Sequence, residues 1–429
     1  MKVVYDISTL AVGHFHPRAR TGVHRAVENI ALGLRDSAQC ELSICAAESY
    51  TVARFAQKYL EAIKHFDGVP FVTSGSGVLR VSNPPRPKPI KPLRPLPIVP
   101  YLYEHGCRWL DARGLTRNAI DPPFNRLDRR ALAGQQIFHS PFSPLPFATL
   151  RIKNLKRFQT VYDLIPILFP QWFQFGEDRL IKRVLGRLAP DDWVLSDSQS
   201  TKNDLCNYLP QLDPARVVVT PLAASQMFYP CRDEAQQAAA RLRYSLPDAP
   251  YLLSLSTLEP RKNIAHTVRC FARVVREQKI PDLHLVLVGT KGWDYDQIFE
   301  SIADVADVKD RIIATGYAAD EDLAAIYSGA LGFVYPSFYE GFGLPPLEAM
   351  QCGVPVITSN TSSLPEVVGD AAIMVDPKSE DELCAAMLDL YQDADLRSRL
   401  SQRSLERAKL FSWQKCIDLT LAAYRASLS

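Results

Sequence analysis

The sequence predicts an α/β protein with two domains, each built on a parallel β-sheet that helices cover on both faces. The chain has 429 residues, which is more than one ordinary domain holds. Short apolar runs alternate with helical patterns in both halves, and such alternation is typical of parallel sheets. A polar stretch over residues 221–249 separates the two series, so we place the domain boundary near residues 222–248.

The first series of elements defines an N-terminal domain over residues 1–222. Its first strand is Lys2–Ile7, followed by a loop with Gly13 and Gly22 and then by a helical pattern through Val27 and Leu34. Further strands are expected near Gln136–His139, Gln159–Tyr162, Trp193–Ser196 and residues 215–220.

The second series defines a C-terminal domain over residues 223–410. Its expected strands are Tyr251–Ser256, Leu283–Gly289, Ile312–Thr315, Gly332–Tyr335, Val354–Thr358 and Ala372–Val375. The last segment, residues 411–429, places apolar residues at helical spacing from Trp413 to Leu428. Ser412 precedes this pattern and is a candidate N-cap.

Composition and charge exclude several classes of protein. The net charge is +2, so no overall field favours nucleic acid, and the 47% of hydrophobic residues suits a packed globular protein. The nine cysteines form no CxxC pair, which fits a reducing compartment. No apolar run reaches the roughly 18 residues of a spanning helix, and the N-terminus does not resemble a signal peptide. We therefore expect a cytoplasmic protein.

Residues 84–100 interrupt the alternation with a run rich in proline and basic residues. Such a density of proline excludes both helix and central strand. Two interpretations fit this segment. It is either an exposed, extended loop or a basic surface for anionic lipid or a lipid-linked acceptor. The second interpretation would bring the protein to the inner face of the membrane as a peripheral protein.

The strongest constellation of chemical groups lies over residues 340–350. Two glycines follow Glu340, and two prolines then start a short helix that we expect to carry Glu348 in its first turn. Free N–H groups at a helix start attract phosphate oxygens, and a carboxylate can accept from two neighbouring hydroxyls. These features suit a nucleotide sugar, although a surface loop with a dipole-compensating Glu348 fits equally well.

A second constellation favours the nucleotide sugar. Arg261 and Lys262 follow the first strand of the second series, Tyr251–Ser256. In parallel sheets, ligands bind beyond the carboxyl ends of the strands. A diphosphate that leaves a sugar develops negative charge there, and a fixed guanidinium and ammonium can stabilise it. An isolated Arg-Lys pair would otherwise indicate only a solvated basic loop.

Together these motifs resemble those of the large fourth family of retaining glycosyltransferases. Glu340 and Glu348 match its E-x7-E signature, and the segment from Glu259 to Asn263 is similar to its E-x-R/K-K-N block. Looser similarities involve Thr21–Arg25, Val161–Pro166, Ser196–Leu205, Gly316-Tyr317 followed by Asp320–Leu323, and Phe411-Ser412-Trp413.

The resemblance implies the GT-B fold, in which two Rossmann-like domains face a cleft and a C-terminal helix crosses back to the N-terminal, acceptor-side domain. It implies a catalytic group of Arg261, Lys262 and Glu340. It assigns donor and nucleotide binding to Gly22, Thr257, Tyr317, Phe342, Gly343, Leu344 and Glu348. It assigns contacts with the acceptor or the sugar to Tyr162, Asp163 and His139, although His139 also fits a purely structural role.

The implied reaction is the transfer of a hexose, with retention, from a nucleotide diphosphate sugar to a glycan or lipid-linked acceptor in surface polysaccharide or lipopolysaccharide assembly. GDP-mannose is the favoured donor, and a UDP- or dTDP-sugar such as rhamnose is the alternative. A sugar-nucleotide epimerase on the same fold and a non-catalytic binding subunit are competing hypotheses.

Two features limit the chemistry. Tyr162 stands where many members carry histidine, and a phenol with a reference pKa of about 10 is a poor general base. The sequence holds two D-x-D triplets, Asp294–Asp296 and Asp393–Asp395, but neither stands in a context that suggests a metal site. We therefore expect no metal and no cofactor.

Overall fold

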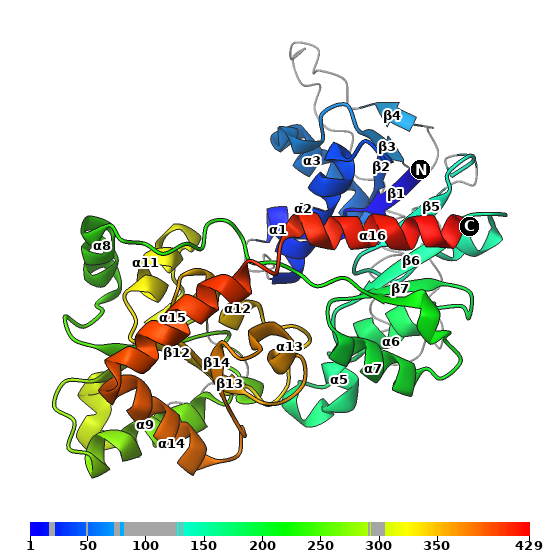
Figure 1. The fold of residues 1–429 in the computed structure, drawn as a ribbon. Coiled ribbons are helices and arrows are strands. Elements are labelled where there is room, and N and C mark those ends of the chain that lie inside the picture. The colour runs from blue at the N-terminus through cyan, green and yellow to red at the C-terminus, as the bar shows by residue number, and fades with distance from the viewer. Residues whose placement is uncertain are drawn as a thin grey trace.

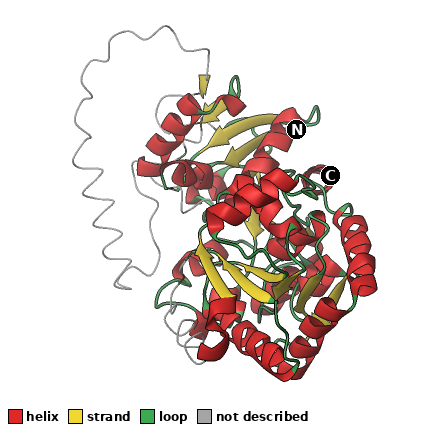
Figure 2. Ribbon diagram, turned by 90° about the vertical axis from the view of Figure 1, so that its left-hand side faces the viewer, coloured by secondary structure: helices red, strands yellow, loops and turns green. Residues whose placement is uncertain are grey.

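The computed structural model describes residues 1–16, 22–48, 50–72, 78–80, 127, 130, 132–290, 292 and 305–429. These residues form two domains, each with its own sheet (Figure 1). Helices surround the strands in both domains, as Figure 2 shows. The expected two-domain parallel α/β fold is therefore confirmed. The proline-rich residues 84–100 and the triplet Asp294–Asp296 lie outside the described residues.

The N-terminal domain contains an eight-stranded sheet with the order β4-β3-β2-β1-β5-β6-β7-β8. Neighbouring strands run parallel except β4, which pairs antiparallel with β3. The central strands β1 and β5 are almost fully buried, because helices cover both faces. The strands are β1 Lys2–Asp6, β2 Glu41–Cys45, β3 Pro70–Val72, β4 Val78–Arg80, β5 Ile137–Ser140, β6 Lys156–Val161, β7 Trp193–Ser196 and β8 Val217–Val219. The helices include α1 Ser8–Phe15, α2 Gly22–Asp36, α3 Tyr50–Ala62, α5 Ile165–Leu168, α6 Arg179–Leu185 and α7 Gln199–Tyr208.

The C-terminal domain contains a six-stranded, all-parallel sheet with the order β11-β10-β9-β12-β13-β14. The direction of strand addition reverses between β9 and β12, which defines the topological switch point of a doubly wound sheet. The strands are β9 Tyr251–Leu255, β10 His284–Val288, β11 Ile312–Gly316, β12 Gly332–Tyr335, β13 Val356–Ser359 and β14 Ala372–Val375. The helices include α8 Glu234–Tyr244, α9 Ile264–Glu277, α11 Leu323–Ser328, α12 Leu344–Gln351, α13 Leu364–Val368, α14 Glu380–Gln392 and α15 Ala394–Ala408.

The segment between the two sheets runs from the end of β8 to the start of β9. Its helix, α8, carries an N-cap at Asp233, whose carboxylate accepts from the backbone N–H groups of Ala235 and Gln236. α8 packs against α11 of the C-terminal domain. The polar helix expected in this segment is therefore present.

The last helix, α16 Trp413–Leu428, crosses from the C-terminal domain onto the N-terminal domain (Figure 1). The Ser412 hydroxyl accepts from the backbone N–H of Lys415 at 3.1 Å, which confirms the expected N-cap. α16 packs against α2, where a side chain at Gly33 would overlap Ile417. The apolar face of α16 thus completes the core of a domain that lies far from it in the sequence.

Most strands of the second series begin and end within two residues of their expected bounds, and β12 and β14 match them fully. Three strands of the first domain, β2, β3 and β4, were not expected from the sequence. Among the helices that the structure describes, none combines the length and the apolar character needed to cross a membrane.

Candidate active site

The candidate active site lies at the carboxyl ends of β9 and β12, on either side of the switch point. The loop after β9 carries Arg261 and Lys262, and the loop after β12 carries Glu340 and leads into α12. In doubly wound sheets, this edge is where ligands bind. The order of the strands therefore brings together two motifs that are about 80 residues apart in the chain.

Glu340 is the centre of a buried ion cluster. Its Oε2 lies 2.7 Å from Nη1 of Arg261, and its Oε1 lies 2.6 Å from Nζ of Lys262. The hydroxyl of Tyr335, the last residue of β12, accepts from Lys262 Nζ at 2.7 Å and donates to Glu340 Oε1 at 2.8 Å. On the other side of the guanidinium, Nη2 of Arg261 lies 2.8 Å from Oε1 of Glu259. The expected catalytic residues therefore meet in one cluster.

The environment fixes the charge of each member. Burial raises the pKa of Glu340, but Arg261 and Lys262 outweigh it and hold that pKa at about 2. Burial lowers the pKa of Lys262, and the neighbouring Arg261 lowers it further. Burial also lowers the pKa of Arg261, but Glu340 and Glu259 more than offset this and raise it above its usual value. Glu340 is therefore an ionised hydrogen-bond acceptor at any physiological pH.

One open donor remains in this cluster. The Nε–H of Arg261 is buried and has no hydrogen-bond partner among the described residues. The formal charges of Arg261, Lys262, Glu259 and Glu340 cancel. An anion would therefore be held by hydrogen bonds and by the N-terminus of α12 rather than by net charge.

Asn263 fixes the two loops relative to each other. It adopts the left-handed conformation, with a φ of 60°, which asparagine tolerates better than most residues. Its side-chain amide donates to the carbonyl oxygens of Pro336 at 3.1 Å and Pro377 at 2.7 Å. In addition, the backbone N–H of Phe338 donates to the Arg261 carbonyl at 3.0 Å. The positions of the charged groups are thus set by backbone contacts.

The loop before α12 touches the N-terminal domain. Gly343 has a φ of 122°, which a residue with a side chain rarely adopts. A Cβ at Gly22, the first residue of α2, would lie 2.8 Å from Leu344 Cδ1. Phe342 is buried and packs edge-on against Phe411, with ring centroids 5.9 Å apart. Four residues expected to bind the donor, Gly22, Phe342, Gly343 and Leu344, therefore gather where the two domains meet.

Glu348 lies in the second turn of α12, so the expectation that it occupies the first turn is wrong. The helix starts at Leu344, one residue before the two prolines that were expected to start it, so Glu348 is its fifth residue. Glu348 is buried, and its carboxylate accepts from the Tyr327 hydroxyl at 3.3 Å and pairs with Arg25 at 3.3 Å. Burial raises its pKa to about 7, although Arg25 and Tyr327 act in the opposite direction.

Two residues of the acceptor group, Tyr162 and Asp163, lie beside the Glu340 loop. A Cβ at Gly341 would overlap the carbonyl oxygen of Tyr162 and lie 3.0 Å from Cβ of Asp163. The pKa of Asp163 is raised by burial and lowered in part by Arg261. The Tyr162 hydroxyl is buried without a partner in the described part of the chain, and burial raises its pKa.

His139 lies in the core, and of the two roles left open for it, its burial favours the structural role over contact with the acceptor or the sugar. It is fully buried, with Nδ1 at 2.6 Å from the Tyr424 hydroxyl and Nε2 at 2.8 Å from Thr160 Oγ1. Burial lowers its pKa to about 3, so the ring is neutral. Both ring nitrogens are used within the protein, because α16 covers the end of β5.

Thr257 and Tyr317 are exposed at the carboxyl ends of β9 and β11. No hydrogen bond or ion pair of the described residues joins either side chain to Glu340 or Glu348. These two residues share the edge of the sheet with the ion cluster but are not part of it.

The sequence analysis gave no site role to Tyr335, Arg25 or Asp320, although Arg25 and Asp320 lie in segments that resemble motifs of the family. Tyr335 was detectable in principle, because it is the last residue of a strand that leads into the Glu340 loop. Arg25 pairs with both Glu348 and Asp320, and the latter contact is 3.0 Å. No sequence pattern shows that a residue of α2 meets residues about 300 positions later, since that contact depends on how the domains pack.

No group of three or more histidine, cysteine, aspartate or glutamate residues in the described ranges is arranged to hold a metal ion. Of the second D-x-D triplet, Asp393 is the N-cap of α15 and accepts from the backbone N–H of Leu396 at 2.8 Å. Asp393 therefore acts as a helix cap.

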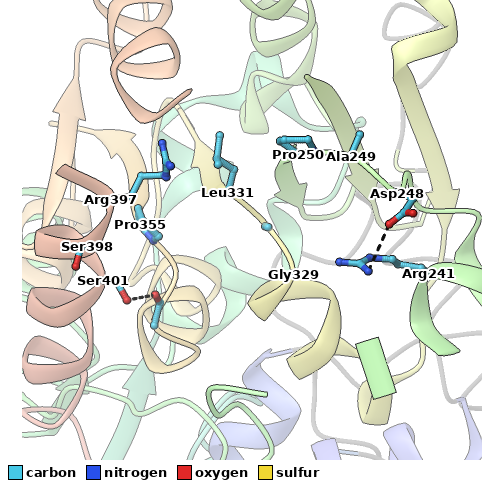
Figure 3. A pocket seen from close by; sticks show the side chains of 12 residues that line it. Arg241, Asp248, Ala249, Pro250, Gly329, Leu331, Pro355, Arg397, Ser398 and Ser401 are labelled. Carbon is cyan, nitrogen blue, oxygen red and sulfur yellow. Dashed lines mark hydrogen bonds and ion pairs between the residues drawn. The ribbon is translucent and has the colours of Figure 1, made fainter. Parts of the chain in front are cut away.

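A hollow of about 560 Å³ lies at the end of the C-terminal sheet opposite the ion cluster, and Figure 3 shows the side chains that line it. Pro250, Leu331 and Pro355 line it, and they immediately precede β9, β12 and β13. It is thus open at the amino ends of the strands, away from the ion cluster.

Comparisons with known proteins identify the family of the chain. Residues 240–407 match the family described as glycosyl transferases group 1. The chain is 36% identical to the O-antigen chain mannosyltransferase B of Escherichia coli over 294 residues, which cover 67% of this chain and 74% of that protein. It is 30% identical to the serotype-specific mannosyltransferase WbdA of the same organism, covering 61% of this chain and 32% of that longer protein.

Solved structures support the fold. The sucrose-phosphate synthase of Thermosynechococcus elongatus superposes with a TM-score of 0.65 at 19% identity, covering 99% of this chain and 98% of that one. The GT-B fold that the sequence resemblance implies is thereby confirmed. The chain belongs to the glycosyl transferases group 1 family and is a glycosyltransferase.

Proposed function

We propose that this glycosyltransferase moves mannose from GDP-mannose to a glycan acceptor in surface polysaccharide assembly, with retention of the anomeric configuration. The observation that carries the proposal is the ion cluster of Arg261, Lys262 and Glu340 at the switch point of the C-terminal sheet. The names of the relatives support mannose as the sugar and the O-antigen as the kind of product.

In this proposal, the C-terminal domain holds the donor. Arg261 and Lys262 donate to the diphosphate. The backbone N–H groups of Gly343 and Leu344 would bind its oxygens, because Pro345 and Pro346 of α12 have no N–H. Glu340, which stays ionised, accepts from hydroxyls of the sugar, and its two cations fix its position. Glu348 accepts from hydroxyls of the ribose. Tyr317 and Thr257 stand exposed at strand ends where the base and the phosphates would pass.

The chemical step needs no strong base from the protein. The acceptor hydroxyl oxygen forms a bond with the anomeric carbon on the face from which the diphosphate departs. The bond between that carbon and the phosphate oxygen breaks, and the hydroxyl proton passes to the departing oxygen. Tyr162 is unsuited to take the proton, because burial raises its pKa. Asp163 lies beside the Glu340 loop and would orient the acceptor.

The proposal is tested first with nucleotides alone. Thermal unfolding of the protein is measured with GDP, UDP, dTDP and CMP, since a ligand that binds only the folded state raises the unfolding temperature. The largest shift is expected with GDP. Product formation is then measured with the matching sugar donors and a glycan acceptor. A larger shift with UDP or dTDP, followed by turnover of that donor, would replace mannose by another sugar.

Two further outcomes separate the competing functions. Conversion of the donor without any acceptor would indicate an epimerase. Nucleotide binding without turnover of any donor would indicate a binding subunit. We also propose that no metal takes part, and activity after dialysis against EDTA is expected to equal the untreated activity.

We propose that the acceptor is lipid-linked and that the N-terminal domain contacts the membrane that carries it. The support is a set of exposed apolar and basic side chains in the segment that follows Asp163: Phe175 is 98% exposed, Leu168 is exposed, and α6 presents Lys182 and Arg183 to solvent. The protein is expected to float with vesicles that contain phosphatidylglycerol, and Phe175→Ser is expected to weaken that flotation. Equal flotation with neutral vesicles would contradict a charge-dependent contact.

A further inference from the structure

Arg25 links the two domains at the nucleotide end of the site. It lies in the first turn of α2 in the N-terminal domain, yet its guanidinium reaches two carboxylates of the C-terminal domain. Nη1 lies 3.3 Å from Oε1 of Glu348, and Nη2 lies 3.0 Å from Oδ1 of Asp320. One side chain therefore binds both α12 and the turn before α11.

The Arg25 side chain is held in place. Its guanidinium carbon lies 5.9 Å from the centre of the Phe228 ring, within reach of a cation–π interaction. Its backbone carbonyl accepts from the side-chain amide of Asn29 at 2.8 Å, which anchors the turn of α2 that carries it. The side chain is 27% exposed, so one part of it faces solvent between the domains.

Glu348 depends on this contact for its charge. It is buried, and no other cation of the described residues pairs with it. The groups that face it are Arg25 from α2, the Tyr327 hydroxyl from α11 and the Asp320 carboxylate from the preceding turn. Asp320 opposes ionisation, whereas Arg25 and Tyr327 favour it. Loss of Arg25 would remove the main interaction that offsets burial, so it would raise the pKa of Glu348 further and reduce the ionised fraction near neutral pH.

We propose that Arg25 is a positioning residue for the donor nucleotide: it keeps the Glu348 carboxylate charged and aimed so that it accepts from the ribose hydroxyls. This inference rests on the proposed function, in which Glu348 binds the ribose. It adds that nucleotide recognition by the C-terminal domain requires a residue of the N-terminal domain. Binding of the nucleotide and the mutual position of the domains are then coupled through one guanidinium.

The test measures the dissociation constants of GDP and 2′-deoxy-GDP by calorimetry from pH 6 to pH 9, with UDP as a second probe. The variants are Arg25→Met, Arg25→Lys, Glu348→Gln and the double variant Arg25→Met with Glu348→Gln. Arg35→Met is the matched control, because Arg35 lies in the last turn of the same helix and pairs with Asp36. Thermal unfolding of each variant verifies that it folds.

Arg25→Met is expected to weaken GDP binding about 10- to 100-fold at pH 7, the range for one charge-assisted hydrogen bond. The loss is expected to shrink as the pH rises, because a higher pH favours the ionised form of Glu348 in the variant as well. The preference for GDP over 2′-deoxy-GDP is expected to fall in Arg25→Met, and Arg25→Lys is expected to restore part of it. In the Glu348→Gln background, Arg25→Met is expected to change little.

Several results would overturn the inference. They are an unchanged affinity in Arg25→Met, a loss that is the same at every pH, or losses that multiply fully in the double variant. If Glu348→Gln weakens GDP binding and Arg25→Met does not, only the role of Arg25 fails. If the wild-type protein binds neither GDP nor UDP, or if Glu348→Gln leaves binding unchanged, the proposed function fails as well.

Discussion

Glu340 shows how two cations can assign a role to a buried carboxylate. A buried glutamate without partners would be neutral at physiological pH and could act as an acid. Here Arg261 and Lys262 each lie within 2.7 Å of one carboxylate oxygen, and the pKa falls to about 2. Glu340 therefore cannot donate a proton during catalysis. Its chemistry is limited to accepting hydrogen bonds and to ordering the two cations.

Lys262 is one of the two cations that pair with Glu340. Lys262→Ala is expected to lower kcat about 100-fold or more, because it removes a donor to the departing diphosphate. It also leaves Glu340 with one cation instead of two. The measurement is the rate of product formation at saturating donor, together with the affinity for the nucleotide.

Lys378→Ala is the control, since Lys378 is an exposed lysine of the same domain. The control is expected to keep wild-type turnover. Wild-type turnover in Lys262→Ala would remove the ion cluster from the mechanism.

The sequence predicted the members of this cluster but not all of their neighbours. Arg261, Lys262 and Glu340 follow predicted strands, so the edge of the sheet on which they lie was predictable. The burial of His139 was not, because it depends on a tyrosine of α16 that is 285 positions away. The contact of Arg25 with Glu348 depends in the same way on how the domains pack.

At the scale of elements, α16 stabilises the N-terminal domain through a polar contact in its core. The Tyr424 hydroxyl is the partner of His139 Nδ1, and both residues are fully buried. Tyr424→Phe would leave a buried ring nitrogen without a partner. It is therefore expected to destabilise the protein by about 1–3 kcal/mol. Thermal or urea unfolding measures the difference.

Tyr208→Phe serves as the control for this substitution, because Tyr208 is 41% exposed on α7. The control is expected to unfold as the wild type does. An equal stability of Tyr424→Phe would show that water or another group replaces the lost hydrogen bond.

The loop before α12 approaches the N-terminal domain closely at Gly341. A Cβ at Gly341 would overlap the backbone of Tyr162 in the other domain. Gly341→Ala is therefore expected to push the loop and the N-terminal domain apart and to lower kcat/KM at least about tenfold, by analogy with overpacked cores. Steady-state kinetics measures the loss.

Gly329→Ala is the matched control, since its Cβ would lie 2.7 Å from the Tyr251 hydroxyl, within the C-terminal domain. This variant is expected to lose stability and to keep its kcat/KM. If both variants lose activity equally, the contact between the domains is not the cause.

The elements differ in how well the sequence predicted them. The strands of the C-terminal domain are apolar runs that glycine, proline and polar turns separate, and their bounds were predicted closely. β2 contains a serine between apolar residues, and β3 and β4 have three residues each. Such short strands gain their stability from pairing in the sheet, which no local pattern reveals.

At the scale of the whole molecule, a second set of contacts joins the domains on the acceptor side. The Glu366 carboxylate accepts from the backbone N–H groups of Gln199 and Ser200 at 2.7 Å each, at the start of α7. The Tyr339 hydroxyl donates to Asp204 at 2.8 Å. Trp172 stacks on Phe338, with ring centroids 5.5 Å apart. Together with Arg25, these contacts hold the domains on both sides of the ion cluster.

Glu366→Ala is expected to lower kcat about threefold to tenfold, the effect of one or two lost hydrogen bonds. The loss of these hydrogen bonds loosens the contact between the domains. The backbone amides at the start of α7 are therefore expected to exchange hydrogen faster. Hydrogen-exchange mass spectrometry and steady-state kinetics measure the two effects. Glu406→Ala is the control, because Glu406 forms an exposed pair with Lys409. Unchanged exchange in Glu366→Ala would contradict a role in holding the domains.

The crossing of α16 constrains the order in which the protein matures during synthesis. Domains usually fold one after another as they leave the ribosome, beginning with the first. Here the first sheet cannot bury Tyr5 and His139 fully until α16 has been translated. In the chain, the second domain lies between the first sheet and α16. The second domain, whose sheet and helices are contiguous in sequence, can therefore be complete before the first. A nascent chain halted before α16 would expose the α2 face to chaperones.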